Sequence, residues 1–163
     1  MKKYELTANF KMHLGKKLYQ IKALVAFGNI EAGELGGYIE KEENLDHSGD
    51  AWVSGNAQVS GNAQVYGDAQ VYGNAQVYGN AQVYGDAQVL KSTHLLQVGA
   101  IGSRNGFTTF FRSKTSNILV TCGCFLGTIE EFAAAVTNRH AGTKHEKTYF
   151  AAIELAKLQI ELD

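Results

Sequence analysis

Valine recurs at every sixth position through the middle of the chain, and an alanine stands two residues before each valine. The valines are Val53, Val59, Val65, Val71, Val77, Val83 and Val89. Residues two apart in an extended segment share a face, so each Ala and Val point one way and the Gln between them points the other. Gly followed by Asn or Asp closes each unit, and these residues tolerate the left-handed backbone of a sharp corner. The pattern predicts short sides that bury their apolar face by stacking.

Seven units, most cleanly N/D-A-Q-V-Y/S-G, run from Asp50 to Val89. They resemble the left-handed parallel β-helix of hexapeptide-repeat proteins, in which three units form one coil. The resemblance implies that residues eighteen apart stack, with Gln58 over Gln76 and Tyr66 over Tyr84. Ile39 and Leu45 fit two further, less regular rungs, and Val53 follows after two extra residues. We therefore expect a left-handed β-helix of about three coils over residues 39–91.

Residues 1–38 read as a β-rich cap. Tyr4–Thr7 and Leu18–Leu24 are strand-like runs on either side of a turn at Gly15. The open end of a stacked helix exposes unpaired backbone groups and needs such a cover. The order LYQIKAL, AF, NIEAGELGGYIE resembles the N-terminal region of phage-borne hexapeptide-repeat proteins, and of an enterobacterial β-helix protein named as an acetyltransferase.

After residue 91 the repeat gives way to an α+β pattern over residues 92–163. Leu95–Arg104 and Phe107–Arg112 are apolar-rich runs on either side of Asn105-Gly106, a strong hairpin signal, and a third strand is expected over Ile118–Phe125. Two helices should follow, because Thr128 with Glu131 and Thr143 with Glu146 have capping-box spacing. The fold class is thus mostly β, with a three-stranded sheet and two helices at the C-terminal end. The segment from about Leu96 to Ile160 resembles a C-terminal domain of uncharacterised bacteriophage proteins, which implies viral origin.

Composition and charge bear on the partners and the cellular location of the protein. Lysine and arginine number 15 against 16 aspartates and glutamates, a net charge of −1, which argues against a nucleic-acid-binding surface. The sequence shows no signal peptide and no membrane-spanning run, and it has two cysteines. We therefore expect a reducing cytoplasmic setting, the host bacterial cytoplasm for a viral protein, and no membrane partner.

The first candidate site surrounds the expected hairpin tip. Its residues are Ser103, Arg104, Thr108 and Arg112. Arginine offers forked donors and a permanent charge, so these side chains and the turn amides are able to bind a phosphate or a carboxylate. A two-residue turn at Asn105-Gly106 would place Ser103 opposite Thr108. The alternative is an ordinary solvent-exposed hairpin tip.

The second candidate is Cys122-Gly123-Cys124 with His140 and His145 downstream. Period two would place both sulfurs on one strand face, which permits a zinc site with the two histidines. The usual structural-zinc spacing has at least two residues between the cysteines, however, so buried strand cysteines without metal are the preferred interpretation. A nucleophilic Cys–His pair is a third alternative.

The exterior of the repeat is the third candidate. Its outward aromatic residues are Tyr66, Tyr72, Tyr78 and Tyr84. Large amphipathic rings are favoured in protein interfaces, and the β-helix resemblance implies a side-by-side homotrimer. A solvated exterior is the alternative for any single face.

Three classes of function follow. Many left-handed β-helices are coenzyme-A-dependent acyltransferases with a histidine base, but no histidine lies between His47 and His94. The preferred hypothesis is a non-catalytic phage protein without a cofactor that inhibits host defence, by binding either a host factor or a small anionic ligand such as a nucleotide signal. A structural part of a virion or an assembly scaffold is the remaining alternative.

Overall fold

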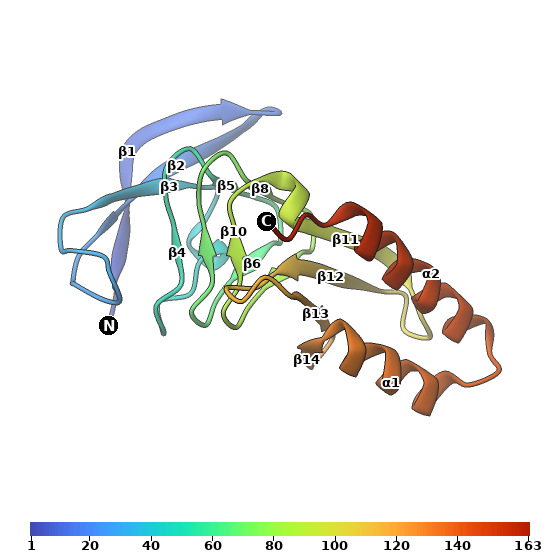
Figure 1. The fold of residues 1–163 in the computed structure, drawn as a ribbon. Coiled ribbons are helices and arrows are strands. Elements are labelled where there is room, and N and C mark those ends of the chain that lie inside the picture. Colours follow the sequence, from blue (N-terminus) through green and yellow to red (C-terminus); the bar gives the residue numbers. More distant parts are fainter.

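The fold was derived from a computed structural model that describes residues 1–163 (Figure 1). Each repeat unit contributes one two-residue strand, and each strand is a Gln followed by a Val except the first. The strands are β4 Trp52–Val53, β5 Gln58–Val59, β6 Gln64–Val65, β7 Gln70–Val71, β8 Gln76–Val77, β9 Gln82–Val83 and β10 Gln88–Val89. The valine periodicity therefore predicted every one of these strands.

The repeat strands stack in three parallel columns. One column runs β3 (Leu35–Ile39), β5, β8, the second pairs β6 with β9, and the third runs β4, β7, β10. Val53 pairs with Val71, eighteen residues later. Ile39 pairs with Val59 and Leu45 bridges to Val65, which confirms the two irregular rungs and the two extra residues. Parallel strands stacked in this way fit a short β-solenoid, and we refer to residues 39–91 as the solenoid.

The alanines and valines of the repeat fill the interior. Every Ala and Val from Ala51 to Val89 in the seven units is fully buried, and burying a valine contributes roughly 1.5–3 kcal/mol relative to leaving it exposed. The corner glycines adopt positive φ, as at Gly73 (φ 68°), where a Cβ would lie 2.4 Å from the carbonyl oxygen of Leu90. Close stacking at the corners therefore requires glycine.

The N-terminal residues cover one end of the solenoid. β1 (Tyr4–His13), β2 (Lys16–Ala23) and β3 form an antiparallel sheet, with a short 3₁₀ helix η1 at Glu42–Asn44. Both first strands are longer than the expected runs. The Lys3 ammonium donates to the carbonyl oxygens of Gly49 (3.1 Å) and Ala51 (2.8 Å), and the Tyr4 hydroxyl donates to that of Leu45 (2.7 Å). These side chains satisfy the backbone groups that an open end would leave unpaired.

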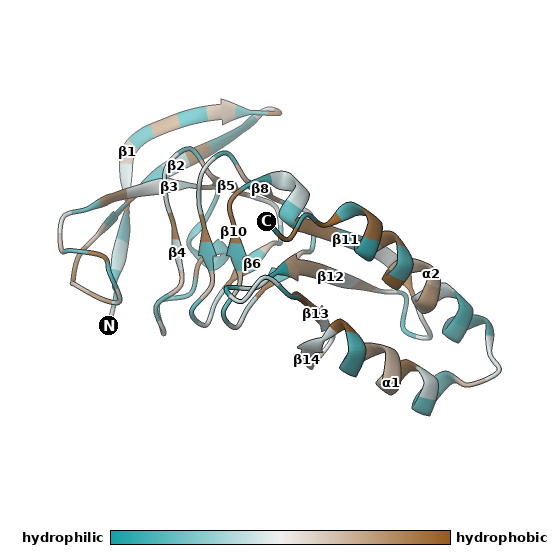
Figure 2. Ribbon diagram, viewed as in Figure 1, coloured by the Kyte–Doolittle hydropathy of each residue, from teal (hydrophilic) through white to brown (hydrophobic).

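The outer part of the β1–β2 hairpin, residues 10–19, projects along the solenoid as an arm (Figure 1). Hydrophilic and hydrophobic residues alternate along β1 (Figure 2), and Phe10, Met12 and Leu14 are exposed large hydrophobic residues. On the inner side, the Lys11 ammonium lies 4.0 Å from the centroid of the Tyr38 ring. The arm is therefore held to the rest of the fold mainly by its inner face.

The C-terminal residues form a four-stranded antiparallel sheet with two helices. After a short 3₁₀ helix η2 (Ser92–His94), the order is β11 (Leu95–Ile101), β12 (Gly106–Arg112), β13 (Ile118–Cys122) and β14 (Phe125–Thr128), followed by α1 (Ile129–His140) and α2 (Lys144–Gln159). The expectation of three strands is wrong. Gly123 has φ 59°, and Cys122 pairs with Phe125 across a tight turn, so the third expected strand is a hairpin.

The two faces of this sheet bury different cores. Phe110 packs with residues of both helices in the C-terminal core, whereas its neighbour Phe111 belongs to the core of the solenoid. On the solenoid side, the backbone N–H of Gln82 donates to Thr109 Oγ1 (3.0 Å), and Thr121 Oγ1 donates to the carbonyl oxygen of Gln82 (2.7 Å). The C-terminal sheet therefore closes the second end of the solenoid, a role that the sequence did not reveal.

Both helix starts agree with the sequence. Thr128 Oγ1 accepts from the N–H of Glu131 (3.1 Å), Glu131 Oε2 accepts from the N–H of Thr128 (2.9 Å), and Thr143 Oγ1 accepts from Glu146 (3.4 Å). The apolar residues of the two helices are buried in one cluster with Phe110, so both helices cover the sheet face that points away from the solenoid. These residues are Ile129, Phe132 and Val136 of α1 and Tyr149, Ala152, Ile153 and Ala156 of α2.

Candidate functional site

A pocket of about 400 Å³ lies in the C-terminal unit, and no residue of the solenoid lines it. The loop between β11 and β12, the turn between β13 and β14, and helices α1 and α2 all contribute to its walls. Its polar lining residues are Ser103, Arg104, Cys122, Cys124, Arg139, His140 and Tyr149, and most of the remaining lining is apolar. We call this cavity the distal pocket. Its volume falls in the range of small-molecule sites, roughly 300–1,000 Å³.

The loop that carries Ser103 and Arg104 is shaped by two residues with positive φ. Gly102 has φ 80° and Asn105 has φ 49°. A Cβ at Gly102 would lie 2.0 Å from Tyr149 Oη, so only glycine lets the loop rest on the tyrosine hydroxyl. The loop is thereby fixed to α2, and Ser103 and Arg104 are placed at the pocket wall.

Tyr149 supplies a buried polar atom to this pocket. Its ring packs edge-on against Phe132, with centroids 5.6 Å apart, and stacks on His140 at 5.7 Å. The hydroxyl lies 3.9 Å from Cys122 Sγ. Burial, with a smaller contribution from Cys122, raises the pKa of Tyr149 to about 12. The hydroxyl therefore stays protonated at physiological pH and is able to donate a hydrogen bond.

Two arginines give the rim of the pocket its positive charge. Arg104 comes from the β11–β12 loop and Arg139 from the last turn of α1, and both are exposed. Neither guanidinium forms an ion pair or a side-chain hydrogen bond within the chain. Unpaired guanidinium groups beside an apolar cavity are suited to an anionic group attached to an apolar or aromatic body.

Sequence reasoning missed Arg139. The spacing of Phe132, Val136, Arg139 and His140 on one face of the helix was the signal, since residues three and four apart are neighbours on a helix surface.

Two of the four residues expected at the hairpin tip lie elsewhere. The expected pairing of Ser103 with Thr108 is wrong, because a four-residue loop separates the strands and Thr108 pairs with Val98. Thr108 is buried, and its Oγ1 donates to Cys122 Sγ (3.4 Å). Arg112 lies at the opposite end of β12, where its Nε donates to the carbonyl oxygen of Leu162 (3.1 Å). The structure therefore brings Ser103 and Arg104 to the pocket, without Arg112.

The cysteines do not share a strand face. Cys122 ends β13, and Cys124 lies in the turn that follows, so the period-two expectation is wrong. Both line the distal pocket with His140, whereas His145 packs against His140 with ring centroids 5.7 Å apart. No group of three or more histidine, cysteine or acidic side chains is arranged to hold a metal ion. Both cysteines are free thiols. The preferred expectation of two buried strand cysteines is wrong, because Cys122 is only half-buried and Cys124 is exposed in the turn.

The exterior tyrosines divide among the three sides of the solenoid. Tyr66 and Tyr84 stack as expected, with ring centroids 4.3 Å apart and planes 19° from parallel. Tyr72 follows β7 and Tyr78 follows β8, so they lie on the other two sides. An interface between chains at these tyrosines stays a prediction.

Comparison with known proteins adds one similarity. The family model described as the YdcK beta solenoid repeat matches residues 57–73, 63–79 and 69–91, all within the solenoid. No curated protein matches the chain. None of the helices combines the length and the apolar character that a membrane crossing would need. The repeat segment, a minority of the chain, is thus similar to the YdcK beta solenoid repeat, and the distal pocket lies outside the matched residues.

Proposed function

We propose that this chain is a non-catalytic binding protein that holds a small anionic ligand in the distal pocket. The observation that carries the proposal is the pair of unpaired guanidinium groups, Arg104 and Arg139, at the rim of an apolar cavity. Aromatic side chains at the wall, Phe107 and Phe125, supply stacking surface for a ring. Ser103 and the protonated Tyr149 hydroxyl supply neutral hydrogen bonds.

A nucleotide combines the required parts, because it joins an aromatic base to a phosphate. We infer a role in which a bacteriophage protein sequesters a nucleotide signal of the host and so inhibits a host defence in the bacterial cytoplasm. The resemblance of the C-terminal segment to bacteriophage proteins motivates this inference. Sequestration needs affinity and enough copies of the protein, and it needs no bond cleavage.

The solenoid has a supporting part in this proposal. We infer a left-handed helix of about three coils that assembles into a trimer, with the exterior tyrosines Tyr66, Tyr72, Tyr78 and Tyr84 available for the contact. Assembly would place three distal pockets on one particle. The native mass of the purified protein tests the trimer, and the mass of a monomer would contradict it.

Calorimetric titration with cyclic dinucleotides and ADP-ribose-type nucleotides tests the pocket. We expect Arg104→Ala and Arg139→Ala each to weaken binding roughly tenfold to a hundredfold, since a charge-assisted hydrogen bond contributes about 1.5–3 kcal/mol. Arg112→Lys is the matched control, because Arg112 lies outside the pocket, and it should bind as the unmodified chain does. Absence of binding to every nucleotide, or full affinity in both alanine variants, would overturn the proposal. Recovery of a converted nucleotide would contradict its non-catalytic part.

A further inference from the structure

A second cavity lies between the arm and the side of the solenoid formed by β5 and β8. It has a volume of about 560 Å³, and its walls come from His13, Leu14 and Lys16 of the arm and from repeat residues between Gln58 and Asn80. We call it the arm groove. It lies in a part of the chain that the distal pocket does not use.

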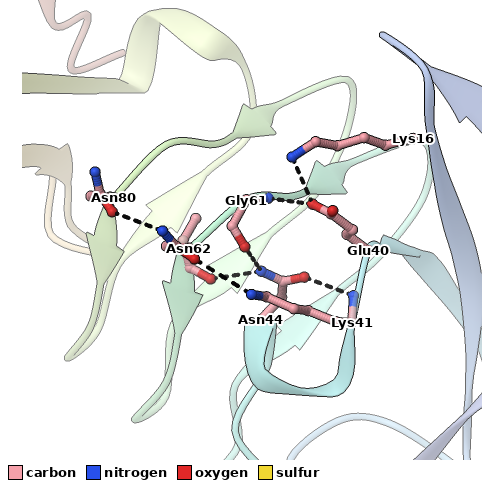
Figure 3. Close-up of polar contacts among 8 residues, drawn as sticks. Lys16, Glu40, Lys41, Asn44, Gly61, Asn62 and Asn80 are labelled. Atoms are coloured by element: carbon pink, nitrogen blue, oxygen red, sulfur yellow. Dashed lines mark hydrogen bonds and ion pairs between the residues drawn. The ribbon is translucent and has the colours of Figure 1, made fainter.

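Amide side chains line this groove in stacked pairs. Gln58 pairs with Gln76 in the parallel register, and Asn62 Nδ2 donates to Asn80 Oδ1 at 3.3 Å (Figure 3). Each primary amide carries both donors and an acceptor. Such a wall is suited to groups that also donate and accept, of which the hydroxyl is the simplest.

One amide oxygen of the wall has no hydrogen-bond donor as a partner. Gln58 Oε1 is buried and accepts no hydrogen bond within the chain. A buried acceptor without a partner costs free energy, about 1–3 kcal/mol. Because this oxygen is covered, a bound hydroxyl reaches it only when the Gln58 amide turns toward the groove, and that contact would recover the cost.

Tyr78 adds an aromatic surface at the same place. Its side of the solenoid lies under the arm, yet the residue is 58% exposed. Tyr66 and Tyr84, on another side, cover one another by stacking. The Tyr78 ring is therefore free to pack against the apolar face of a flat ligand.

The charged groups beside the arm groove have partners within the chain. The Lys41 ammonium donates to Asn62 Oδ1 (3.4 Å) (Figure 3). Lys16 forms an ion pair with Glu40 (3.3 Å), and the carboxylate accepts from the N–H of Gly61 (2.6 Å) (Figure 3). The Gly61 N–H and Lys16 hold the pKa of Glu40 below its usual value, so the pair stays charged and self-neutralising. The grooves on the other two sides contain several carboxylates, Glu42, Glu43 and Asp46 on one and Asp50, Asp68 and Asp86 on the other. The lining of the arm groove contains no acidic residue, which favours a non-ionic polar ligand there over the other two grooves.

We propose that the arm groove binds a neutral oligosaccharide. A pyranose ring has an apolar face that packs on an aromatic ring, and its hydroxyls both donate and accept, as the amide wall requires. The sugar hydroxyls pair with Gln58, Gln76 and Asn80, while one ring stacks on Tyr78. This site is independent of the distal pocket and of any nucleotide. Because Tyr78 stacks on the sugar in this proposal, a trimer contact would use the tyrosines on the other two sides of the solenoid.

The repeat supplies a matched control for the test. Tyr72 occupies the equivalent unit position on a side that has no arm over it. The probes are maltotetraose, cellotetraose and chitotetraose, titrated into the full chain and followed by saturation-transfer NMR and calorimetry. We expect at least one tetrasaccharide to bind, Tyr78→Ala to weaken that binding roughly tenfold or more, and Tyr72→Ala to leave it unchanged.

Gln76→Ala serves as the second variant, because Gln76 is exposed and its loss should not affect folding. It should also weaken sugar binding, with an unchanged circular dichroism spectrum. Failure of all three tetrasaccharides to bind would overturn the proposal, as would equal losses in Tyr78→Ala and Tyr72→Ala. Nucleotide titration of Arg104→Ala and Tyr78→Ala distinguishes the two sites. Arg104→Ala should lose nucleotide binding, and Tyr78→Ala should keep it.

Discussion

His94 shows how a single buried residue makes stability depend on pH. The backbone N–H of Leu90 donates to His94 Nδ1 (3.2 Å), and the ring is buried against the end of the solenoid. Burial lowers the pKa of His94, and the nearby charges of Arg112 and Lys91 lower it further. As the pH falls below about 6.5, the unfolded chain therefore takes up this proton before the folded chain does.

We expect the free energy of unfolding to decrease as the pH is lowered from 7 to 5, partly through His94. His94→Asn keeps an acceptor near the Leu90 N–H but cannot be protonated in this range. Urea titrations at several pH values should therefore show a smaller loss for this variant than for the unmodified chain. Equal losses in the two proteins would show that His94 does not contribute.

The conformation of the loop at the distal pocket could not be predicted from the sequence. Asn105-Gly106 indicated a two-residue turn, and Ser103 was placed opposite Thr108 on that basis. The chain instead uses Gly102 and Asn105 as its positive-φ positions, because Gly102 packs on the hydroxyl of Tyr149. That contact joins residues 47 positions apart, and no local pattern encodes it.

At the scale of elements, the end of the solenoid depends on two threonines. Thr109 accepts from the N–H of Gln82, and Thr121 donates to its carbonyl oxygen. Valine has nearly the same shape but no hydroxyl, so Thr109→Val and Thr121→Val would each leave a backbone group of Gln82 without a partner. We expect each to lower the free energy of unfolding by about 1–3 kcal/mol.

Thr137→Val is the control, because Thr137 is exposed on α1 and its hydroxyl makes no hydrogen bond within the chain. Its effect should stay within about 0.5 kcal/mol. Chemical denaturation measures all three variants. If Thr109→Val and Thr121→Val changed the free energy of unfolding as little as the control does, the proposal that the sheet closes the end of the solenoid would be contradicted.

Elements were predictable where a repeating or local pattern specifies them. The six-residue period gave each solenoid strand, and the Thr and Glu pairs gave both helix starts. The third sheet strand was misjudged, because an apolar run interrupted by Gly123 fits both one strand and a hairpin. The packing of β12 between two cores depends on tertiary contacts, and the alternation of Phe110 and Phe111 does not reveal which core each residue enters.

At the scale of the whole molecule, the solenoid is a stack closed at both ends, by Lys3 and Tyr4 at one end and by the C-terminal sheet at the other. Each repeat strand pairs with a strand eighteen residues away in the chain, and β7 pairs with two, β4 before it and β10 after it. Stability in such a stack is approximately a sum over neighbouring layers. The length of the stack should therefore be adjustable, provided that the register is kept.

Two deletions test this register. Removing residues 62–79 joins Gly61 to Asn80 and takes out eighteen residues, so every remaining Val stays inside and both closing contacts persist. We expect this variant to be less stable but to unfold cooperatively. Removing residues 62–76 takes out only fifteen residues, so one side of the coil is three residues short and Val77 falls at a corner. Because three is an odd number, the shift in register also turns inward-facing residues outward. Urea titration followed by circular dichroism should therefore show a lower free energy of unfolding for the fifteen-residue deletion than for the eighteen-residue deletion. Equal or greater stability of the fifteen-residue variant would contradict the eighteen-residue register.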